Sequence, residues 1–353
     1  MFMKSKYEIG RIFIAVSMLA LILSACAAPQ AAPAVEPAPP EEATAAAEEP
    51  TAEPKPELST LRYGGQIYPE EYLLKGKDFW LEKYGLTVEH TLFSSASENN
   101  QALISGAIDV NIGSDSRSVS LFSVMGDQVV IIAASQRGDR YSTMVMPDSG
   151  ITSWKDMVGQ KVGIRLGTGA EQVVRRYFEI AGDLKWEDFE WIDLKVEDMA
   201  AALADGSIAS FTAWEPTPAI AQATTGAQVM MSYGEVAMTP VLIHTTKEYA
   251  AEHHDELVAF LRGQLDKVAM IQNDLDEASR VASEVASSMG SEVSADIFKT
   301  IFERVDFSLE VDDAVIAALN DTAQFLKDQG QIDTIPEFYV DTSFLEEAKA
   351  LNQ

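Results

Sequence analysis

Residues 161–182, KVGIRLGTGAEQVVRRYFEIAG, constrain the fold of this chain more than any other stretch. Apolar residues at alternate positions indicate a short buried strand, Gly167-Thr168-Gly169 indicates a tight turn, and the apolar spacing that follows indicates an amphipathic helix. A glycine turn lets backbone N–H groups approach a ligand, and the helix directs the positive end of its dipole at the same place. Taken alone, the stretch is equally an ordinary joint in which Thr168 caps the helix.

The same strand–turn–helix pattern recurs along the chain and predicts an α/β fold. Short connections favour parallel sheets with right-handed crossovers, flanked by helices. The pattern restarts near residue 141, so we expect two lobes joined by two crossovers: 58–142 plus 246–353, and 143–245. Expected strands are 60–67, 86–93, 107–112, 128–134, 141–146, 189–193, 208–213, 228–231 and 241–245; expected helices include 70–84, 97–105, 115–124, 197–204, 215–224, 254–273 and 312–329.

The first 57 residues are predicted to target and tether the protein. Residues 1–26 combine a basic start, an apolar run and the sequence Leu23-Ser24-Ala25-Cys26, which resembles a bacterial lipobox. Cys26 would then carry the lipid and anchor the protein outside the cytoplasm, on the bacterial cell membrane. Residues 27–57 are mostly Ala, Pro and Glu, a composition that predicts a disordered tether.

Charge and cysteine content exclude several classes of function. The formal net charge is −29, which argues against nucleic-acid binding. An anionic ligand would therefore need local N–H groups or a few placed arginines, because the overall field repels it. Cys26 is the only cysteine, so the mature chain is expected to have no disulfide, no cysteine nucleophile and no cysteine metal site.

A candidate ligand site comes from the polar turns that follow the predicted strands. Ligands of such sheets bind beyond the carboxyl ends of the strands, in a cleft that can close by hinging. Serine and aspartate in these turns also serve as ordinary helix caps. The candidate ligand-binding residues are Gln66, Tyr68, Ser94, Ser95, Ser97, Asn99, Ser114, Asp115, Ser116, Arg140, Tyr141, Thr168, Gly169, Ala170, Trp214 and Glu215.

Three of the charged and aromatic candidates leave alternatives open. The indole of Trp214 suits an apolar or cationic group, and the neighbouring Glu215 would either pair with an ammonium or cap its helix. Arg140, like Arg137, would either pair with an anion or remain solvated at the surface.

The sequence argues against an enzyme. The four histidines are His90, His244, His253 and His254, and the adjacent pair does not share one helix face. No Gly-x-Ser-x-Gly motif or convincing triad is present, and we expect neither a metal nor a cofactor.

Several segments together resemble the substrate-binding proteins of ABC importers, of the aliphatic sulfonate, taurine and nitrate type. This group also includes binders of thiamine-pyrimidine precursors. The resemblance implies a type II periplasmic-binding-protein fold, which closes on its ligand like a Venus flytrap. It also implies permease and ATPase subunits as partners, and a monomer. The segments are 76–116, 129–135, 145–172, 201–216 and 321–333.

The resemblance leaves the ligand open. A sulfonate or taurine-like compound ranks first, although the GTGAEQ loop of residues 167–172 departs from the Ser/Thr-rich loop common in sulfonate binders. A flat heterocyclic vitamin or precursor, such as the thiamine pyrimidine or riboflavin, ranks second because Tyr68, Tyr141 and Trp214 would sandwich it. Nitrate or bicarbonate ranks third. A tethered sensor, which presents its liganded lobes to a signalling partner, is the remaining alternative.

Overall fold

The computed structural model describes residues 58–352 except residues 95 and 292. The predicted signal segment, the lipidated Cys26, the tether and Ser95 lie outside the described residues.

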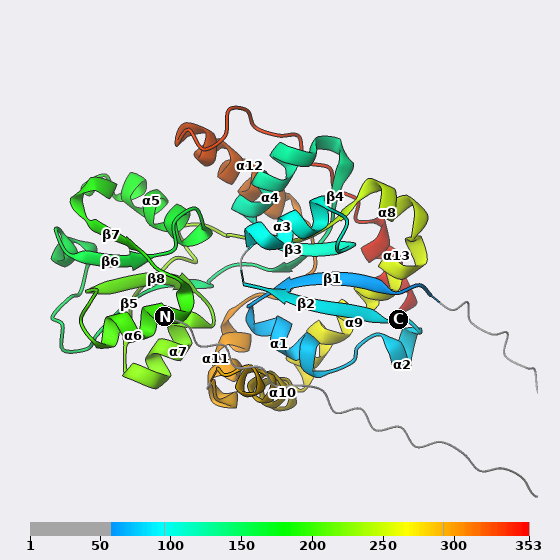
Figure 1. The fold of residues 1–353 in the computed structure, drawn as a ribbon, viewed down its shortest axis with the longest axis horizontal. Helices are drawn as coiled ribbons and strands as arrows, with labels where there is room; N and C mark the ends of the chain where they lie inside the picture. Colours follow the sequence, from blue (N-terminus) through cyan, green and yellow to red (C-terminus); the bar gives the residue numbers. More distant parts are fainter. Residues whose placement is uncertain (1–57, 95, 292, 353) are drawn as a thin grey trace, which may run out of the picture. The chain divides into compact units, whose positions relative to one another are not determined.

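One sheet has five strands in the order β2-β1-β3-β10-β4 (Figure 1). β1 runs parallel to β2 and to β3, whereas β10 runs antiparallel to β3 and to β4. The strands are β1 (Leu61–Gln66), β2 (Val88–Phe93), β3 (Val110–Ser114), β4 (Val129–Gln136) and β10 (Val241–Thr246).

A second sheet also has five strands, in the order β7-β6-β8-β5-β9. β6 is parallel to β7 and β8, and β5 is antiparallel to β8 and β9. The strands are β5 (Tyr141–Val145), β6 (Lys161–Ile164), β7 (Glu190–Asp193), β8 (Ser210–Trp214) and β9 (Gln228–Ser232).

The chain passes between the two sheets twice, from β4 to β5 and from β9 to β10. These crossovers make the sheets mixed rather than wholly parallel. β5 and β10 each follow directly on a strand of the other sheet, with no helix in between. A parallel strand would need a crossover helix to bring the chain back to the edge where its neighbours begin, so β5 and β10 run antiparallel to theirs. The predicted lobe limits need correction at the same places: β10 belongs to the first sheet, and Tyr141 and Ser142 belong to the second.

Helices cover both sheets (Figure 1). They are α1 (Pro69–Gly76), α2 (Leu81–Tyr84), α3 (Ala96–Ile104), α4 (Asp115–Met125), α5 (Gly169–Ala181), α6 (Val196–Ala204), α7 (Thr217–Thr225), α8 (Lys247–Glu252), α9 (His254–Asn273), α10 (Leu275–Ser288), α11 (Ala295–Arg304), α12 (Asp313–Asp328) and α13 (Ser343–Leu351).

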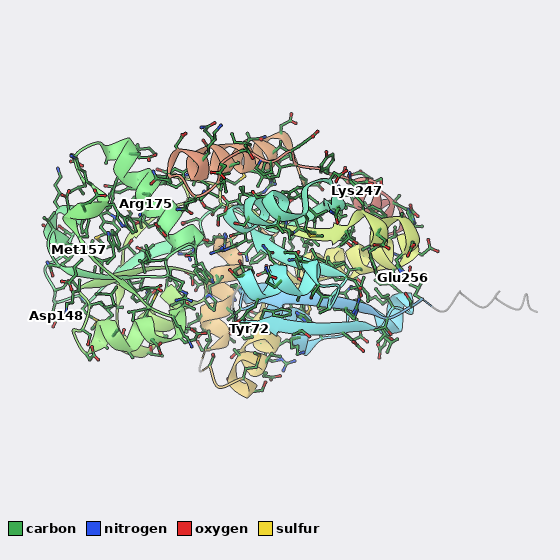
Figure 2. All side chains as sticks on the ribbon, turned by 45° about the horizontal axis from the view of Figure 1, so that its top comes forward. Tyr72, Asp148, Met157, Arg175, Lys247 and Glu256 are labelled. Carbon is green, nitrogen blue, oxygen red and sulfur yellow. The ribbon has the colours of Figure 1, made fainter. Side chains whose placement is uncertain are left out.

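Strand periodicity explains the two-sided core of the first sheet. Along β4, Val130 and Ile132 pack with α1, α9 and α10, whereas Val129 and Ile131 pack with α4 and α12 on the other face. This alternation follows from the two-residue repeat of a strand, and a strand covered on both faces reads as a continuous apolar run. Figure 2 shows side chains filling the space between strands and helices, with Lys247 on the outer surface.

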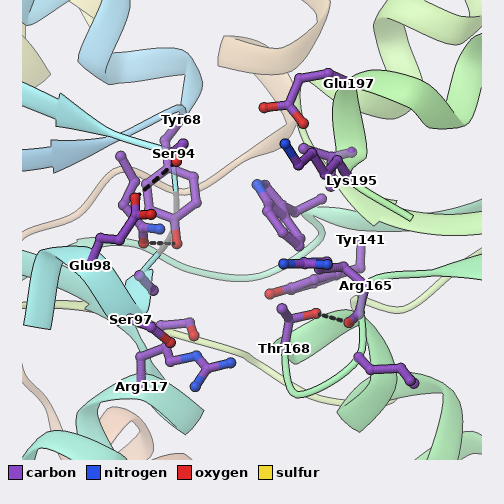
Figure 3. Close-up of a pocket in the computed structure, with 17 residues that line it drawn as sticks. Tyr68, Ser94, Ser97, Glu98, Arg117, Tyr141, Arg165, Thr168, Lys195 and Glu197 are labelled. Atoms are coloured by element: carbon purple, nitrogen blue, oxygen red, sulfur yellow. Dashed lines mark hydrogen bonds between the residues drawn. The ribbon is translucent and has the colours of Figure 1, made fainter. Parts of the chain in front are cut away.

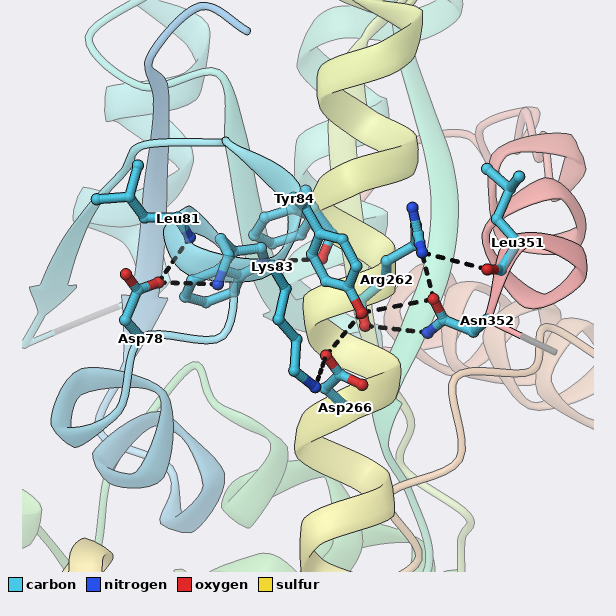
Figure 4. A network of polar contacts seen from close by, with 10 residues as sticks. Asp78, Leu81, Lys83, Tyr84, Arg262, Asp266, Leu351 and Asn352 are labelled. Carbon is cyan, nitrogen blue, oxygen red and sulfur yellow. Dashed lines mark hydrogen bonds and ion pairs between the residues drawn. The ribbon is translucent and has the colours of Figure 1, made fainter. Parts of the chain in front are cut away.

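The helix predicted at 70–84 is two helices, because Asp78 interrupts it. The Asp78 carboxylate accepts hydrogen bonds from the backbone N–H groups of Trp80 (2.8 Å) and Leu81 (2.9 Å), and so begins α2. The hydroxyl of Tyr84 then donates to Asp266 on α9 at 2.7 Å, which holds α2 against that helix (Figure 4).

The end of the described chain is attached to the same long helix. Arg262 on α9 donates through Nε to Asn352 Oδ1 at 2.7 Å and through Nη2 to the carbonyl of Leu351 at 3.2 Å (Figure 4). α13 therefore packs beside α9 as part of the layer that covers the first sheet.

Candidate ligand-binding site

A cavity of about 350 Å³ lies between residues that follow strands of the two sheets (Figure 3). One wall comes from the first sheet and its helices: Gln66, Tyr68, Ser94, Ala96, Ser97, Glu98, Ser114 and Arg117. The facing wall comes from the second sheet: Tyr141, Arg165, Leu166, Thr168, Gly169, Lys195, Val196, Glu197 and Trp214.

Strand direction brings these residues together. β1, β2 and β3 run parallel, so the residues at their carboxyl ends share one edge of the sheet, and the same holds for β6, β7 and β8. Tyr141 begins the antiparallel strand β5 and pairs with Trp214, the last residue of β8, so it reaches the same edge. The rings of Tyr141 and Trp214 meet edge to face at 6.3 Å.

Many of the predicted site residues lie on the cavity wall, and the others have different positions. Those on the wall are Gln66, Tyr68, Ser94, Ser97, Ser114, Tyr141, Thr168, Gly169 and Trp214. Those elsewhere are Asn99, Asp115, Ser116, Arg140, Ala170 and Glu215.

Asn99 links two strands of the first sheet instead of facing the cavity. Its fully buried amide donates to the carbonyl of Gly64 on β1 (2.9 Å) and to that of Ile112 on β3 (3.0 Å). The side chain thus satisfies backbone acceptors that burial would otherwise leave unpaired.

Asp115 is also held by the protein itself. Its carboxylate accepts hydrogen bonds from Thr322 on α12 (2.6 Å) and from the backbone N–H of Ser116 (2.9 Å). Burial raises the pKa of Asp115, and these donors oppose the rise. Ser116 exchanges a hydrogen bond with Ser114 (3.2 Å) and lines a neighbouring cavity of about 230 Å³.

Glu215 has a partner within the chain. It is buried and forms an ion pair with Arg304 on α11, and it accepts the backbone N–H of Ala219 at 3.3 Å. It therefore caps the start of α7 rather than presenting a carboxylate to a ligand ammonium.

Ala170 lies inside α5, where its N–H donates to the Thr168 hydroxyl at 3.3 Å, so Thr168 caps that helix.

Arg140 lies behind the cavity wall, with 1% of its surface exposed. Its guanidinium carbon is 4.6 Å from the centre of the Tyr141 ring and 5.6 Å from that of Tyr68. Its Nη2 donates to the Tyr141 hydroxyl (3.1 Å), and its Nε donates to the carbonyl of Thr239 (2.9 Å).

Sequence reasoning missed the charged residues of the cavity: Glu98, Arg117, Arg165, Lys195 and Glu197. The rule that found the other candidates could have found them too. Arg117 lies one position beyond the turn considered after β3, and Lys195 and Glu197 follow β7, a strand whose turn was not considered. A search for charged residues close to the ends of the strands would have found them, because an anionic ligand needs local cations in so acidic a chain.

The cations of the cavity differ in how they are neutralised. Arg165 pairs with Asp193 at 3.1 Å, and Lys195 is exposed at the edge. Arg117 forms no ion pair or side-chain hydrogen bond with any of the residues that the structure describes. Burial lowers the pKa of Arg117, but an arginine remains charged at any physiological pH.

Hydroxyl groups of tyrosine, serine and threonine also line the cavity. Burial raises the pKa of Tyr68 and of Tyr141, so both stay protonated at neutral pH. Tyr68 donates its proton to Gln66 Oε1 at 2.8 Å, and Ser94 donates to Glu98 at 2.9 Å (Figure 3). The cavity therefore combines three cations and two glutamates with hydroxyl groups and aromatic faces. This lining suits a small ligand with a charged group and an apolar body.

The described residues contain neither a candidate metal cluster nor a helix suited to span a membrane. Among residues 58–352, with 95 and 292 set aside, no cluster of three or more His, Cys, Asp or Glu side chains is placed to hold a metal ion. Within the same residues, no helix has the length and apolar character needed to cross a membrane.

Comparison with known families gives a match over residues 72–278 to the family described as NMT1/THI5 like. The chain belongs to this family. A protein of Bacillus subtilis (strain 168), provisionally assigned as an aliphatic sulfonates-binding protein, is 24% identical over 233 residues, which are 64% of this chain and 70% of the relative. The family relationship predicted from the sequence segments is confirmed.

Solved structures share the fold. The periplasmic aliphatic sulphonate-binding protein SsuA of Escherichia coli matches with a TM-score of 0.69 and 20% identity, over 80% of this chain and 90% of that one. The alkanesulfonate-binding SsuA of Xanthomonas axonopodis pv. citri, solved with MOPS bound, matches with a TM-score of 0.68 and 16% identity, over 80% and 96%. The type II periplasmic-binding-protein fold is therefore confirmed.

Proposed function

We propose that this NMT1/THI5-like protein captures a small sulfonate in the cavity between its two sheets and delivers it to an ABC importer. The observation that carries the proposal is the guanidinium of Arg117, which lines the cavity and forms no ion pair within the described chain. A partly buried cation without a carboxylate is costly unless an anion completes it. A sulfonate supplies that charge and several acceptor oxygens.

The position of Arg117 also supports closure around an anion. It belongs to α4, which packs on the first sheet, yet a Cβ atom placed on Gly167 of the facing loop would lie 3.4 Å from Arg117 Nη2. Arg117 thus reaches the opposite wall, where an anion would contact both walls and favour the closed state.

The cavity favours a sulfonate with an organic body over the other ligands considered. At about 350 Å³, it is far larger than nitrate or bicarbonate. Tyr141 and Trp214 meet at an interplanar angle of 70°, so these two rings do not form a parallel clamp for a flat heterocycle. Relatives with sulfonate-binding names, including one solved with MOPS, support the same choice.

In this proposal the protein works outside the cytoplasm, where a lipid on Cys26 tethers it to the membrane. It acts as a monomer and presents its ligand to permease and ATPase subunits. The lobes proposed to close on the ligand are the two sheets with their helices. A tethered sensor remains the second candidate because it would use the same cavity.

We propose a binding protein rather than an enzyme. The desulfurization enzyme DszB shares the fold at a TM-score of 0.62 and 15% identity, a likeness that extends to the fold alone. In this chain the only cysteine is Cys26, which the proposal assigns to the anchor.

Calorimetric titration of the chain without its signal segment tests the ligand. We expect taurine or an alkanesulfonate to bind one per chain, and nitrate, the thiamine pyrimidine and riboflavin to bind far more weakly. Tight binding of a heterocycle with no response to any sulfonate would replace the proposed ligand.

The variant Arg117→Gln tests the observation behind the proposal. A hydrogen bond to a charged group contributes about 1.5–3 kcal/mol, so sulfonate affinity should fall roughly 10- to 100-fold. Arg165→Gln is the matched comparison, because Asp193 already neutralises Arg165, and its loss should be clearly smaller. Equal losses in the two variants would remove the special role of Arg117.

A further inference from the structure

Arg140 carries a guanidinium that is buried behind the cavity wall. No carboxylate among the described residues lies within ion-pair distance of it, and it has only 1% of its surface exposed. The negative charges of Asp115 and Glu70 favour its charged form from farther away, but neither carboxylate forms an ion pair with it. A buried cation without an ion-pair partner is costly, so its position needs an explanation. Arg140 does not line the cavity, but Tyr68 and Tyr141, the two aromatic rings closest to its guanidinium, do.

The backbone around Arg140 is arranged to hold it in place. Its Nε donates to the carbonyl of Thr239, which adopts a φ of 44°. A β-branched residue rarely adopts this left-handed conformation, and such strain concentrates where geometry serves function. The Thr239 carbonyl thus fixes one side of the guanidinium and leaves Nη2 directed at Tyr141.

The two tyrosines of the cavity differ in where their hydroxyl protons go. Tyr68 donates its proton to Gln66 Oε1 at 2.8 Å. The Tyr141 hydroxyl accepts a hydrogen bond from Arg140 Nη2 at 3.1 Å, and no described residue accepts the proton of Tyr141. A hydroxyl that accepts from a guanidinium becomes a stronger donor, because the hydrogen bonds of a chain polarise one another.

The surroundings of Tyr141 leave its hydroxyl directed at the cavity. Figure 3 shows the Tyr141 side chain extending from its wall into the space between the two walls. A Cβ atom on Gly169 would lie 2.2 Å from the Tyr141 oxygen, so the hydroxyl sits against the first residue of α5. The positive end of a 13-residue helix therefore adds to the charge of Arg140 at the same point.

We propose that Tyr141 is the donor that selects a negatively charged group in the cavity, and that Arg140 is a positioning residue that orients and polarises its hydroxyl from behind the wall. The inference rests on the proposed function and deepens it. It places the anionic group of the ligand at the Tyr141 hydroxyl on the second wall, facing Arg117 on the first wall.

The test compares a charged ligand with an uncharged analogue of similar shape. Affinities for 1-butanesulfonate and for butyl methyl sulfone are measured by calorimetry in the wild-type chain, Tyr141→Phe and Tyr68→Phe. Tyr141→Phe should weaken the sulfonate about 10-fold or more and the sulfone only a few-fold, because a hydrogen bond to a charged group contributes more than a neutral one. Tyr68→Phe should keep the wild-type ratio of the two affinities.

A substitution of Arg140 tests its role as a positioning residue, because Arg140 does not line the cavity and its replacement removes no direct contact with the ligand. Arg140→Met should lower the preference for sulfonate over sulfone, and Arg140→Lys should restore part of it. If Arg140→Met does not fold, the Tyr141→Phe comparison still decides the proposal. The inference is overturned if Tyr141→Phe keeps the wild-type preference for sulfonate. Failure of the wild-type chain to bind any sulfonate would instead overturn the proposed function, and the inference with it.

Discussion

At the residue scale, the cavity depends on a glycine that leaves room for the Tyr141 hydroxyl. Gly169 is the first residue of α5, where alanine would normally favour the helix. A methyl group there would meet the Tyr141 oxygen at 2.2 Å, inside any permitted contact distance. Gly169 is therefore explained by the position of the Tyr141 hydroxyl and not by the needs of the helix.

We expect Gly169→Ala to lower sulfonate affinity roughly 10-fold, because the Tyr141 hydroxyl must move and its charge-assisted hydrogen bond is lost. Calorimetric titration measures the effect. In combination with Tyr141→Phe, the two losses should not add, since both act on one hydroxyl. Fully additive losses would show that Gly169 acts on the ligand by another route.

At the scale of elements, α12 connects helices that belong to the two sheets. The buried hydroxyl of Thr322 on α12 donates to Asp115 on α4 (2.6 Å) and accepts from Gln172 on α5 (2.7 Å). Arg176 of α5 adds an ion pair with Asp321 on the same helix. α12 thus fixes how α5, which begins at the cavity, is placed against α4, which carries Arg117.

Thr322→Val should lower the free energy of unfolding by about 1–3 kcal/mol, because the Asp115 carboxylate loses a buried donor. The effect should depend on pH. Burial raises the pKa of Asp115 above its usual 3.8, so its ionised form costs stability, and this cost grows as the pH rises above that value. The loss should be larger at pH 7 than at pH 3.5.

Urea unfolding at the two pH values measures the difference. Thr300→Val is the matched control, since its exposed hydroxyl donates only to a carbonyl one turn earlier on α11. A loss in Thr322→Val that is the same at both pH values would show that Asp115 is not the group affected.

At the scale of the whole molecule, a chain of net charge −29 is proposed to take up an anion. The field of the molecule opposes this, so recognition must rest on short-range cations and donors at one place. Arg117, which lines the cavity, and Arg140, which donates to the wall residue Tyr141, are proposed to meet that need. If the proposed tether holds, the acidic surface would be repelled by anionic lipid head groups.

The prediction at this scale concerns the proposed lipid anchor at Cys26. Cys26→Ser should release the protein from the membrane fraction, because the only residue able to take the lipid is then absent. Membrane fractionation after carbonate washing, with labelled palmitate as tracer, measures both location and modification. Unchanged membrane association of the variant would refute the lipid anchor, and retained sulfonate binding by the released chain would show that the folded part is intact.

Local patterns in the sequence predict the order of the elements and place the polar turns at one end of each sheet. Apolar periodicity and turn residues are local properties, so short windows predict strands at 60–67, 107–112 and 241–245, which the structure places at 61–66, 110–114 and 241–246. The cap at Thr168 is equally local. The family resemblance rested on the same segments. The break at Asp78 was missed because an aspartate that caps a new helix has the same sequence pattern as a polar residue on the exposed face of one continuous helix.

Which of the polar residues face the cavity depends on contacts between distant parts of the fold. Asn99, Asp115 and Glu215 follow strands just as Ser94 and Ser114 do, yet carbonyls, Thr322 and Arg304 satisfy them. Whether a polar side chain is free for a ligand depends on partners that lie up to 207 positions away along the chain, and no local pattern reveals them. For the same reason the unpaired Arg117 and the Arg140–Tyr141 contact emerged only once the sheets were in place.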